Sequence, residues 1–463
     1  MDISREHVDH FLRGLRRGTE ELSHSMGSDV VRKLHPWVVG EILAERQESR
    51  LAALLGAPRT TAGSSHPVLI NLVSGRAAPV EVVPASSEET RVHVRRRQAE
   101  ADLSLSRLRA DLSDRGIEIG AEFWLTHSLT AMLTTAEVEV IAARADVDSI
   151  TSDKRQIVIN LNNSRPLIGA DQVQAGGITG KGIAVAIQDT GVDASHPALA
   201  GVVGAQQDMT GTAVKRDDFG HGTHCAGIVA SQDGTFRGIA PGANLIDIRL
   251  MDGNGASQPS WCVAAFTAAV TSGARVSSNS WGFTHANGAW TDSNGTCVLC
   301  TAANNTVAAG VTVAVAAGNE DNDSCASYDT HLDCPGIADS VITVAASDKS
   351  DKMAGFSSIG PTPDNRAKPD ITAPGVDITS CQATGTSLGP VTAPGFVKLS
   401  GTSMATPHVA GVAALILSKN PGQSPANVKS LIMSTAVNIG ATANEMGAGR
   451  VNALAAVNQT PQG

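Results

Sequence analysis

One serine of the chain has the surroundings of a nucleophile. Ser403 follows a glycine turn at Gly401 and precedes Met-Ala-Thr-Pro-His and an Ala, Val, Leu and Ile run that ends at Leu417. Because this run is apolar on nearly every face, it predicts a buried helix, with Pro407 in its first turn. A hydroxyl at a helix N-terminus lies beside free backbone N–H groups, which stabilise a developing negative charge. Taken alone, the segment fits a nucleophile and a simple helix cap equally well.

Three further loops carry polar side chains beside glycines. Asp189 ends an apolar strand, His221 and His224 lie in Gly-His-Gly-Thr-His, and Asn319 follows Val-Ala-Val-Ala-Ala-Gly. The aspartate could form a turn or orient an imidazole, and the asparagine could form a turn or donate to an oxyanion. The histidine pair could bind a metal, but no carboxylate stands at matching spacing on that helix, so the sequence favours no metal there.

Together these loops resemble the subtilisin-like serine peptidases, or subtilases. The resemblance depends on Asp189-Thr-Gly, His221-Gly-Thr-His, Ala317-Gly-Asn and Gly401-Thr-Ser-Met-Ala-Thr-Pro, and it extends from about Pro166 to Asn458. The order Asp, His, Ser is the subtilisin order, whereas an α/β-hydrolase has the order Ser, Asp, His. A second Gly-Thr-Ser at 385–387 lacks the helix start and is expected to be a loop.

The resemblance implies a role for each motif residue. Ser403 attacks the scissile carbonyl, and His221 takes its proton and later gives it to the leaving amine. Asp189 fixes the tautomer of the imidazole and stabilises its charged form. The side chain of Asn319 and the backbone N–H of Ser403 form the oxyanion hole.

The resemblance also implies two strands that flank an extended peptide substrate. The expected substrate-binding residues are Gly253, Gly255, Ser280, Trp281, Gly282, Ala317 and Gly318. Trp281 stands where the family often has Leu, which predicts a narrower apolar pocket. Cys225, after the histidine motif, resembles the proteinase K-like variants and is expected beneath His221 as a small buried hydrophobe.

The segments between these motifs predict an α/β fold. Short apolar strands alternate with helices from about Pro166 onward, which predicts a parallel sheet with helices on both faces and catalytic loops at the strand carboxyl ends. The expected strands are Gly182–Gln188, Leu245–Leu250, Arg275–Ser280, Val311–Ala316, Val341–Ala345 and one at Ile371, and the expected helices include Ser260–Ser272 and Cys300–Ala309.

The chain ahead of this sheet predicts further domains. Residues 1–56 are expected to be helical, 57–66 a linker, 67–153 a ferredoxin-like βαββαβ unit, 154–165 a processing tail, and 166–463 the catalytic domain. The βαββαβ unit is expected from strands at Val68–Val73, Ile117–Trp124, Ser128–Leu133 and Val147–Ser152 and helices at Ser87–Asp114 and Thr135–Ala143. This unit resembles the subtilase propeptide, which implies a chaperone and inhibitor of the same chain.

Seven cysteines, an odd number, leave at least one thiol unpaired within the chain. Cys297 and Cys300 form a CxxC, followed by Cys325 and Cys334. Four such cysteines could hold zinc, but the second pair is nine residues apart, so a local disulfide or free thiols are favoured.

Composition narrows the partners. The net charge of −10 argues against a nucleic-acid-binding protein. The sequence contains no apolar run of about eighteen residues, so we expect no transmembrane helix. The N-terminus lacks the pattern of a secretory signal, so we expect a cytoplasmic protein, with secretion as the alternative.

The sequence therefore predicts a serine endopeptidase made as a self-inhibited zymogen that acts on peptides or proteins. No cofactor is expected for the chemistry; structural calcium is conceivable, although the short loop Ser231–Phe236 makes one common site doubtful. The alternatives are a regulated intracellular processing protease that recruits a protein partner through residues 1–56, and a catalytically silent binding scaffold.

Overall fold

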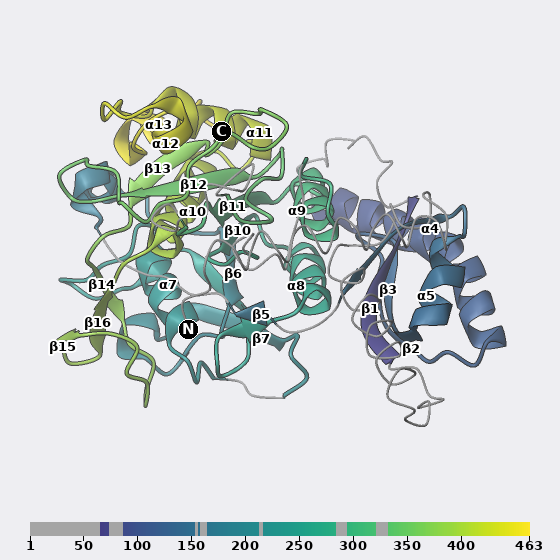
Figure 1. Ribbon diagram of the computed structural model, residues 1–463. Coiled ribbons are helices and arrows are strands. Elements are labelled where there is room, and N and C mark those ends of the chain that lie inside the picture. The colour runs from purple at the N-terminus through teal and green to yellow at the C-terminus, as the bar shows by residue number, and fades with distance from the viewer. Residues whose placement is uncertain are drawn as a thin grey trace, which may run out of the picture. The chain divides into compact units, whose positions relative to one another are not determined.

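The computed structural model describes seven stretches of the chain, which form two compact units (Figure 1). The stretches are residues 65–73, 87–152, 156–157, 164–212, 216–283, 294–320 and 332–463. The helical segment predicted over 1–56 lies outside the described residues. No helix among these stretches is both long and apolar enough to cross a membrane.

The smaller unit is built on a four-stranded antiparallel sheet. Its elements follow the predicted βαββαβ order: β1 (Ser65–Leu72), α4 (Ser87–Asp114), β2 (Ile119–Phe123), β3 (Ser128–Thr134), α5 (Thr135–Ala142) and β4 (Val147–Ser152). The strand order is β2-β3-β1-β4. Leu105, Leu108 and Leu112 of α4 are buried with the apolar side chains of the sheet and of α5. The N-cap of α5 is Thr134 and not Thr135 as expected, because its side chain and that of Glu137 form a reciprocal capping box.

The larger unit carries a seven-stranded parallel sheet in the order β13-β12-β11-β10-β6-β8-β7. These strands are β6 (Ala184–Asp189), β7 (Val203–Asp208), β8 (Asn244–Arg249), β10 (Val276–Asn279), β11 (Thr312–Ala316), β12 (Ile342–Ser347) and β13 (Ile371–Pro374). The predicted parallel sheet is therefore confirmed, and six of its strands match the predicted ranges to within a few residues. The edge strand β7 was not predicted.

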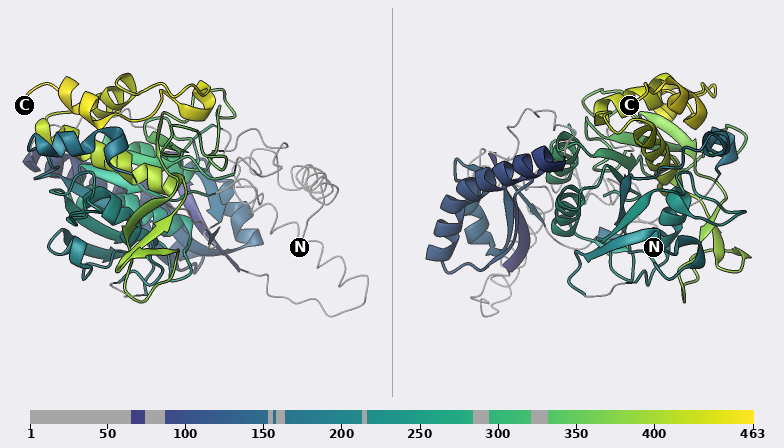
Figure 2. Two further views of the ribbon diagram at one scale, coloured as in Figure 1. Left: turned by 90° about the vertical axis from the view of Figure 1, so that its left-hand side faces the viewer. Right: turned by 180° about the vertical axis from the view of Figure 1, so that it is seen from behind.

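Helices cover both faces of this sheet (Figure 1). One face carries α8 (Pro259–Thr271) and α9 (Val298–Ala308), and the other carries α7 (His221–Ala230) and α10 (Thr402–Lys419). The C-terminal helices α11 (Pro425–Ser434), α12 (Ala443–Met446) and α13 (Ala453–Gln459) gather at one end of the unit (Figure 2), where α11 and α13 pack on α10.

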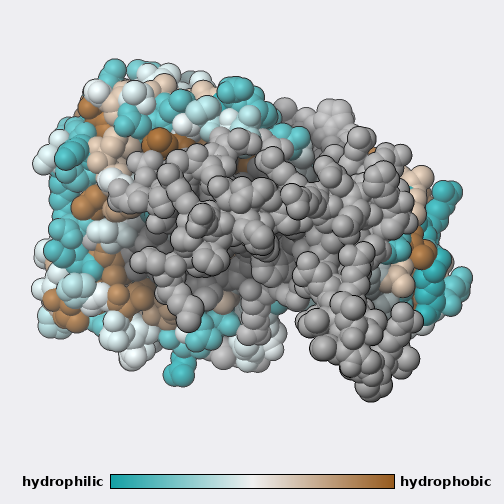
Figure 3. Space-filling view, in the orientation of Figure 1, coloured by the Kyte–Doolittle hydropathy of each residue, from teal (hydrophilic) through white to brown (hydrophobic). Residues whose placement is uncertain are grey.

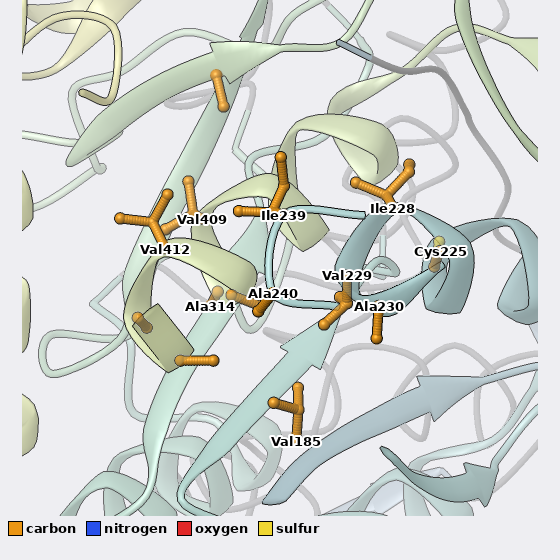
Figure 4. Packing of buried hydrophobic residues seen from close by; sticks show 14 of the residues in the cluster. Val185, Cys225, Ile228, Val229, Ala230, Ile239, Ala240, Ala314, Val409 and Val412 are labelled. Carbon is orange, nitrogen blue, oxygen red and sulfur yellow. The ribbon is translucent and has the colours of Figure 1, made fainter. Parts of the chain in front are cut away.

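The helix α10 lies at the centre of the core. All its residues from Thr402 to Leu417 are buried. Figure 4 shows Val409 and Val412 of α10 beside Ile239, with Val185 of β6 and Val229 of α7 in the same cluster. Since Ala, Val, Leu and Ile fill the helix on every side, burial of this helix was predictable from composition.

Two small sheets complete the unit. One is antiparallel in the order β14-β16-β15, formed by β14 (Ile378–Cys381), β15 (Val391–Ala393) and β16 (Phe396–Leu399). The other pairs β5 (Gln156–Ile157) with β9 (Ala256–Ser257). On the face of the molecule shown in Figure 3, polar residues are interspersed with scattered apolar ones where the surface is coloured.

Candidate active site

Three adjacent strands bring the predicted motifs to one edge of the sheet. Asp189 is the last residue of β6, Ser280 follows β10, and Asn319 lies three residues after β11. The strand β10 pairs with β6 on one side and β11 on the other. Because all three strands are parallel, their carboxyl ends meet at the same edge. The N-terminus of α10, with Ser403, packs against β10 and β11.

A buried hydrogen bond joins Asp189 to His221. Nδ1 of His221 lies 2.5 Å from Oδ1 of Asp189, which also accepts the backbone N–H of Thr190 at 2.8 Å. Both side chains are only 1% exposed. Burial opposes the charged imidazole, but the negative charge of Asp189 outweighs it and raises the pKa of His221 well above 6.5. With Nδ1 held as the donor, Nε2 is the ring atom that can accept a proton.

The close approach of α7 to the Asp189 loop requires a glycine. A Cβ on Gly222 would lie 2.1 Å from the carbonyl oxygen of Gly191 and 3.0 Å from Cβ of Asp189. No side chain fits at that distance, so the glycine after His221 lets the imidazole reach the carboxylate.

Sequence reasoning missed Asp217, which organises the start of α7. This carboxylate is 2% exposed and accepts five hydrogen bonds. Oδ1 accepts from Thr190 Oγ1, Phe219 N and Gly220 N at 2.9, 3.2 and 2.7 Å, and Oδ2 accepts from Thr223 N and Thr223 Oγ1 at 2.9 and 2.7 Å. Burial raises the pKa of Asp217 despite these donors. The signal in the sequence was an acid three residues before the glycine that opens the helix.

Ser403 is held by contacts to both β10 and α7. Its hydroxyl donates to the carbonyl oxygen of Ser280 at 3.0 Å, and the hydroxyl of Ser280 donates to the carbonyl oxygen of Ser403 at 2.7 Å. The thiol of Cys225 lies 3.7 Å from that same oxygen and 3.8 Å from Nδ1 of His221. A single buried thiol therefore contacts both the histidine and the serine backbone, as expected for a residue beneath the imidazole.

The prediction that Pro407 lies in the first turn of the helix is wrong. The helix begins at Thr402, so Pro407 falls in its second turn, where its missing N–H leaves the carbonyl oxygen of Ser403 without an intrahelical donor. The hydroxyl of Ser280 and the thiol of Cys225 supply donors to that oxygen instead. The proline therefore links the nucleophile segment to its neighbours.

Thr402 fixes the orientation of the Asn319 amide. Oδ1 of Asn319 accepts from the backbone N–H of Thr402 at 2.9 Å and from its hydroxyl at 3.2 Å. Because a backbone N–H can only donate, the amide oxygen must face Thr402 and the NH₂ group must point away from it. That NH₂ group is the one an oxyanion would need. Nothing in the sequence pattern pointed to this role of Thr402 beyond its place before the serine.

The turn after β8 carries the first substrate-binding prediction. Gly253 and Gly255 lie in this turn, which leads into β9. The backbone of β9 pairs antiparallel with Gln156 and Ile157 of the tail that follows the smaller domain. A strand adjoining the predicted site therefore already binds an extended segment of the same chain.

The second group of predicted substrate-binding residues surrounds Ser403. Gly318 donates to and accepts from the hydroxyl of Thr402, and Ala317 precedes it. Trp281 is 1% exposed and contacts Phe266 of α8 and Phe283. Its ring therefore belongs to the core, and the structure does not support the expected narrowing of a pocket by Trp281. The second Gly-Thr-Ser lies in the loop after β14, as expected.

The described residues do not favour a metal at the histidines. Nε2 of His224 lies 3.2 Å from the carbonyl oxygen of Val397, and burial lowers the pKa of His224 to about 3. Nδ1 of His221 is engaged in the hydrogen bond to Oδ1 of Asp189.

Three thiols gather at the start of α9. The sulfur of Cys334 lies 2.7 Å from that of Cys297 and 3.1 Å from that of Cys300. The structure thus brings three of the four predicted ligands together, and the alternatives of a zinc site, a local disulfide and free thiols stay predictions. Cys325 lies outside the described residues, and the structure forms no disulfide among the six cysteines that it describes.

The sequence and the fold of this chain are similar to those of known proteins. The model of the subtilase family matches residues 180–449. Subtilisin DY of Bacillus licheniformis is 39% identical over 277 residues, which cover 59% of this chain and 91% of the relative. Subtilisin NAT of Bacillus subtilis subsp. natto is 32% identical over 377 residues, which cover 80% of this chain and 91% of the relative. The fold also matches fervidolysin of Fervidobacterium pennivorans, a keratinolytic enzyme related to subtilisin, with a TM-score of 0.63 and 24% identity over 87% of this chain; the match spans 62% of the fervidolysin chain.

Proposed function

Because this chain belongs to the subtilase family and is a subtilisin-like serine endopeptidase, we propose that Asp189, His221, Ser403 and Asn319 hydrolyse the peptide bond and that the chain is made as a self-inhibited zymogen. The observation that carries the catalytic part is the buried 2.5 Å contact between Asp189 and His221. The thiol of Cys225 lies 3.8 Å from Nδ1 of that histidine and 3.7 Å from the carbonyl oxygen of Ser403, at the start of α10.

In the proposed reaction the same catalytic residues act in both acylation and deacylation. The hydroxyl of Ser403 turns from the carbonyl oxygen of Ser280 toward Nε2 of His221, which takes its proton while Oγ bonds to the carbonyl carbon. The imidazolium, stabilised by Asp189, gives this proton to the leaving amine as the C–N bond breaks. Water then attacks the acyl ester by the same route and releases the acid. The NH₂ group of Asn319 donates to the oxyanion in both halves.

The zymogen part is supported by the tail between the two domains. Gln156 and Ile157 pair with β9 beside the Gly253–Gly255 turn, as an extended peptide would. Seven residues later, the backbone N–H of Ser164 donates to Nε2 of His408 at 2.9 Å, inside the catalytic unit. We place the processing site between Ile157 and Ser164, within the predicted tail 154–165. The smaller domain ahead of it would then remain as an inhibitor.

Intact mass spectrometry of wild type beside Ser403→Ala tests both parts. Wild type should give two fragments whose masses sum to the full chain plus one water and should react with a serine-directed fluorophosphonate. Ser403→Ala should stay whole and unlabelled. Ile157→Pro, which places a proline in the strand that pairs with β9, should slow processing. Equal processing of wild type and Ser403→Ala would overturn processing in cis, and unlabelled wild type that cleaves no peptide would overturn the catalytic assignment.

A further inference from the structure

The proposed mechanism makes no use of one buried acid beside the site. Asp333 is 3% exposed, and its Oδ1 has no hydrogen-bond partner within the part of the chain that the structure describes. Its backbone N–H donates to the carbonyl oxygen of Ala317 at 2.8 Å, which attaches it to the segment that ends in Asn319. A buried carboxylate without a partner is costly, so its position calls for an explanation.

The carboxyl group lies against two glycines that we predict from the sequence to bind substrate. A Cβ on Gly282 would lie 2.4 Å from Cβ and 2.7 Å from Oδ2 of Asp333, and a Cβ on Gly318 would lie 2.9 Å from the same Oδ2. No side chain therefore separates the acid from either backbone. The two residues come from different strands, Gly282 after β10 and Gly318 after β11.

These two glycine segments flank the reacting carbonyl. Ser280, two residues before Gly282, accepts the hydroxyl of Ser403, and Gly318 directly precedes Asn319. A carbonyl attacked by Ser403 and held by Asn319 lies between the segments, and the side chain of the residue that supplies it enters there. That side chain then meets the carboxyl group of Asp333.

The charge around Asp333 indicates which substrate side chain would bind beside it. Glu320, next to Asn319, is also buried, so a second carboxyl group acts on the same region. Burial, and then the charge of Glu320, raise the pKa of Asp333 well above its usual range. A Lys or Arg side chain would supply a positive charge and the donors for Oδ1.

We propose, on the basis of the proposed function, that Asp333 selects substrates with Lys or Arg as the residue whose carbonyl is attacked. Asp333 is a specificity residue in this proposal and takes no part in proton transfer.

Matched fluorogenic peptides test the proposal without changing their shape. Arginine is compared with citrulline, its uncharged isostere, and lysine with norleucine at the residue before the cleaved bond. Wild type should cleave the arginine peptide with a kcat/KM about 100-fold above that of the citrulline peptide, the range expected when a buried charge is paired. Asp333→Asn should bring this ratio to within about threefold of one, chiefly through the arginine peptide.

Active sites are counted with a fluorophosphonate, so a folding defect in Asp333→Asn does not change the comparison. Asp377→Asn, which removes a surface acid paired with Lys398, is the control and should keep the wild-type ratio. Labelled wild type that cleaves arginine and citrulline peptides equally would overturn this inference and leave the peptidase intact. A preference for arginine that survives Asp333→Asn would also overturn it. Wild type that neither labels nor cleaves would overturn the proposed function and this inference together.

Discussion

The carboxylate of Asp217 offers a direct test of how the histidine is positioned. In Asp217→Asn the amide oxygen can keep the three donors now at Oδ1, but the NH₂ group replaces Oδ2 and faces the backbone N–H of Thr223. That buried donor loses its acceptor, which costs about 1–3 kcal/mol, and the bond from the Thr223 hydroxyl costs about 1 kcal/mol more. A neutral amide is cheaper to bury than a carboxylate, as the raised pKa of Asp217 indicates, so we expect a net loss near the lower end, about 2 kcal/mol.

The assay is thermal unfolding in a Ser403→Ala background, which prevents self-digestion. A loss of about 2 kcal/mol should lower Tm by about 5 °C for a unit of this size. With Ser403 present, kcat should fall about tenfold and KM should change little, because α7 begins at His221 and its first turn loses support. Asp233→Asn is the matched control: its Oδ1 caps a partly exposed turn at Thr235 and Phe236, and an amide oxygen can take the same place. A Tm for Asp217→Asn within 1 °C of that of Asp233→Asn would refute this reasoning.

Two further predictions concern the same site. The pKa of His221 is raised in the folded chain, so the stabilisation from its charged form is fully present below the unfolded pKa of 6.5 and is lost as pH rises through the higher folded value. NMR titration of the imidazole ring in Ser403→Ala should therefore give a midpoint above pH 6.5. A midpoint below pH 6.5 would contradict the assigned role of Asp189. Thr402→Val removes one hydroxyl from the Asn319 oxygen, so kcat should fall about fivefold to tenfold at nearly constant KM, with recovery in Thr402→Ser; no recovery in the serine variant would point to packing instead.

Local patterns in the sequence predicted the elements well. The helix over Ser87–Asp114 and the strand over Val147–Ser152 begin and end where the sequence places them, because charge, apolar spacing and turn residues all agree there. The parallel sheet followed from alternating apolar strands and helices. In contrast, the prediction for Pro407 relied on the local preference of proline for the first helical turn. In the structure Pro407 lies in the second turn, where Ser280 and Cys225 donate to the carbonyl oxygen that its missing N–H leaves unpaired in the helix.

The residues that the sequence missed act across long chain separations. The role of Asp333 depends on its contact with Gly282 and Gly318, and the role of Thr402 depends on its hydrogen bond to Asn319. Neither contact can be inferred from the neighbouring sequence. The motif residues were identifiable because their types and order resemble a family. Their supporting partners have ordinary types, such as Thr and Ser, at positions with no periodic or motif signal.

The central placement of α10 has a consequence for how the enzyme comes into being. This helix packs on β10 to β13 and on α7, and it brings Ser403 into contact with Cys225 and Ser280, which lie 178 and 123 residues earlier in the chain. Contacts between segments so far apart in the sequence require the closure of long loops, and the entropy cost of closure comes before the contacts stabilise the fold. Folding of this unit should therefore be slow. A ribosome-bound chain that has not yet released α10 therefore has no complete site. The nascent polypeptide, with most of its own cleavable backbone still exposed, cannot be attacked by its own nucleophile.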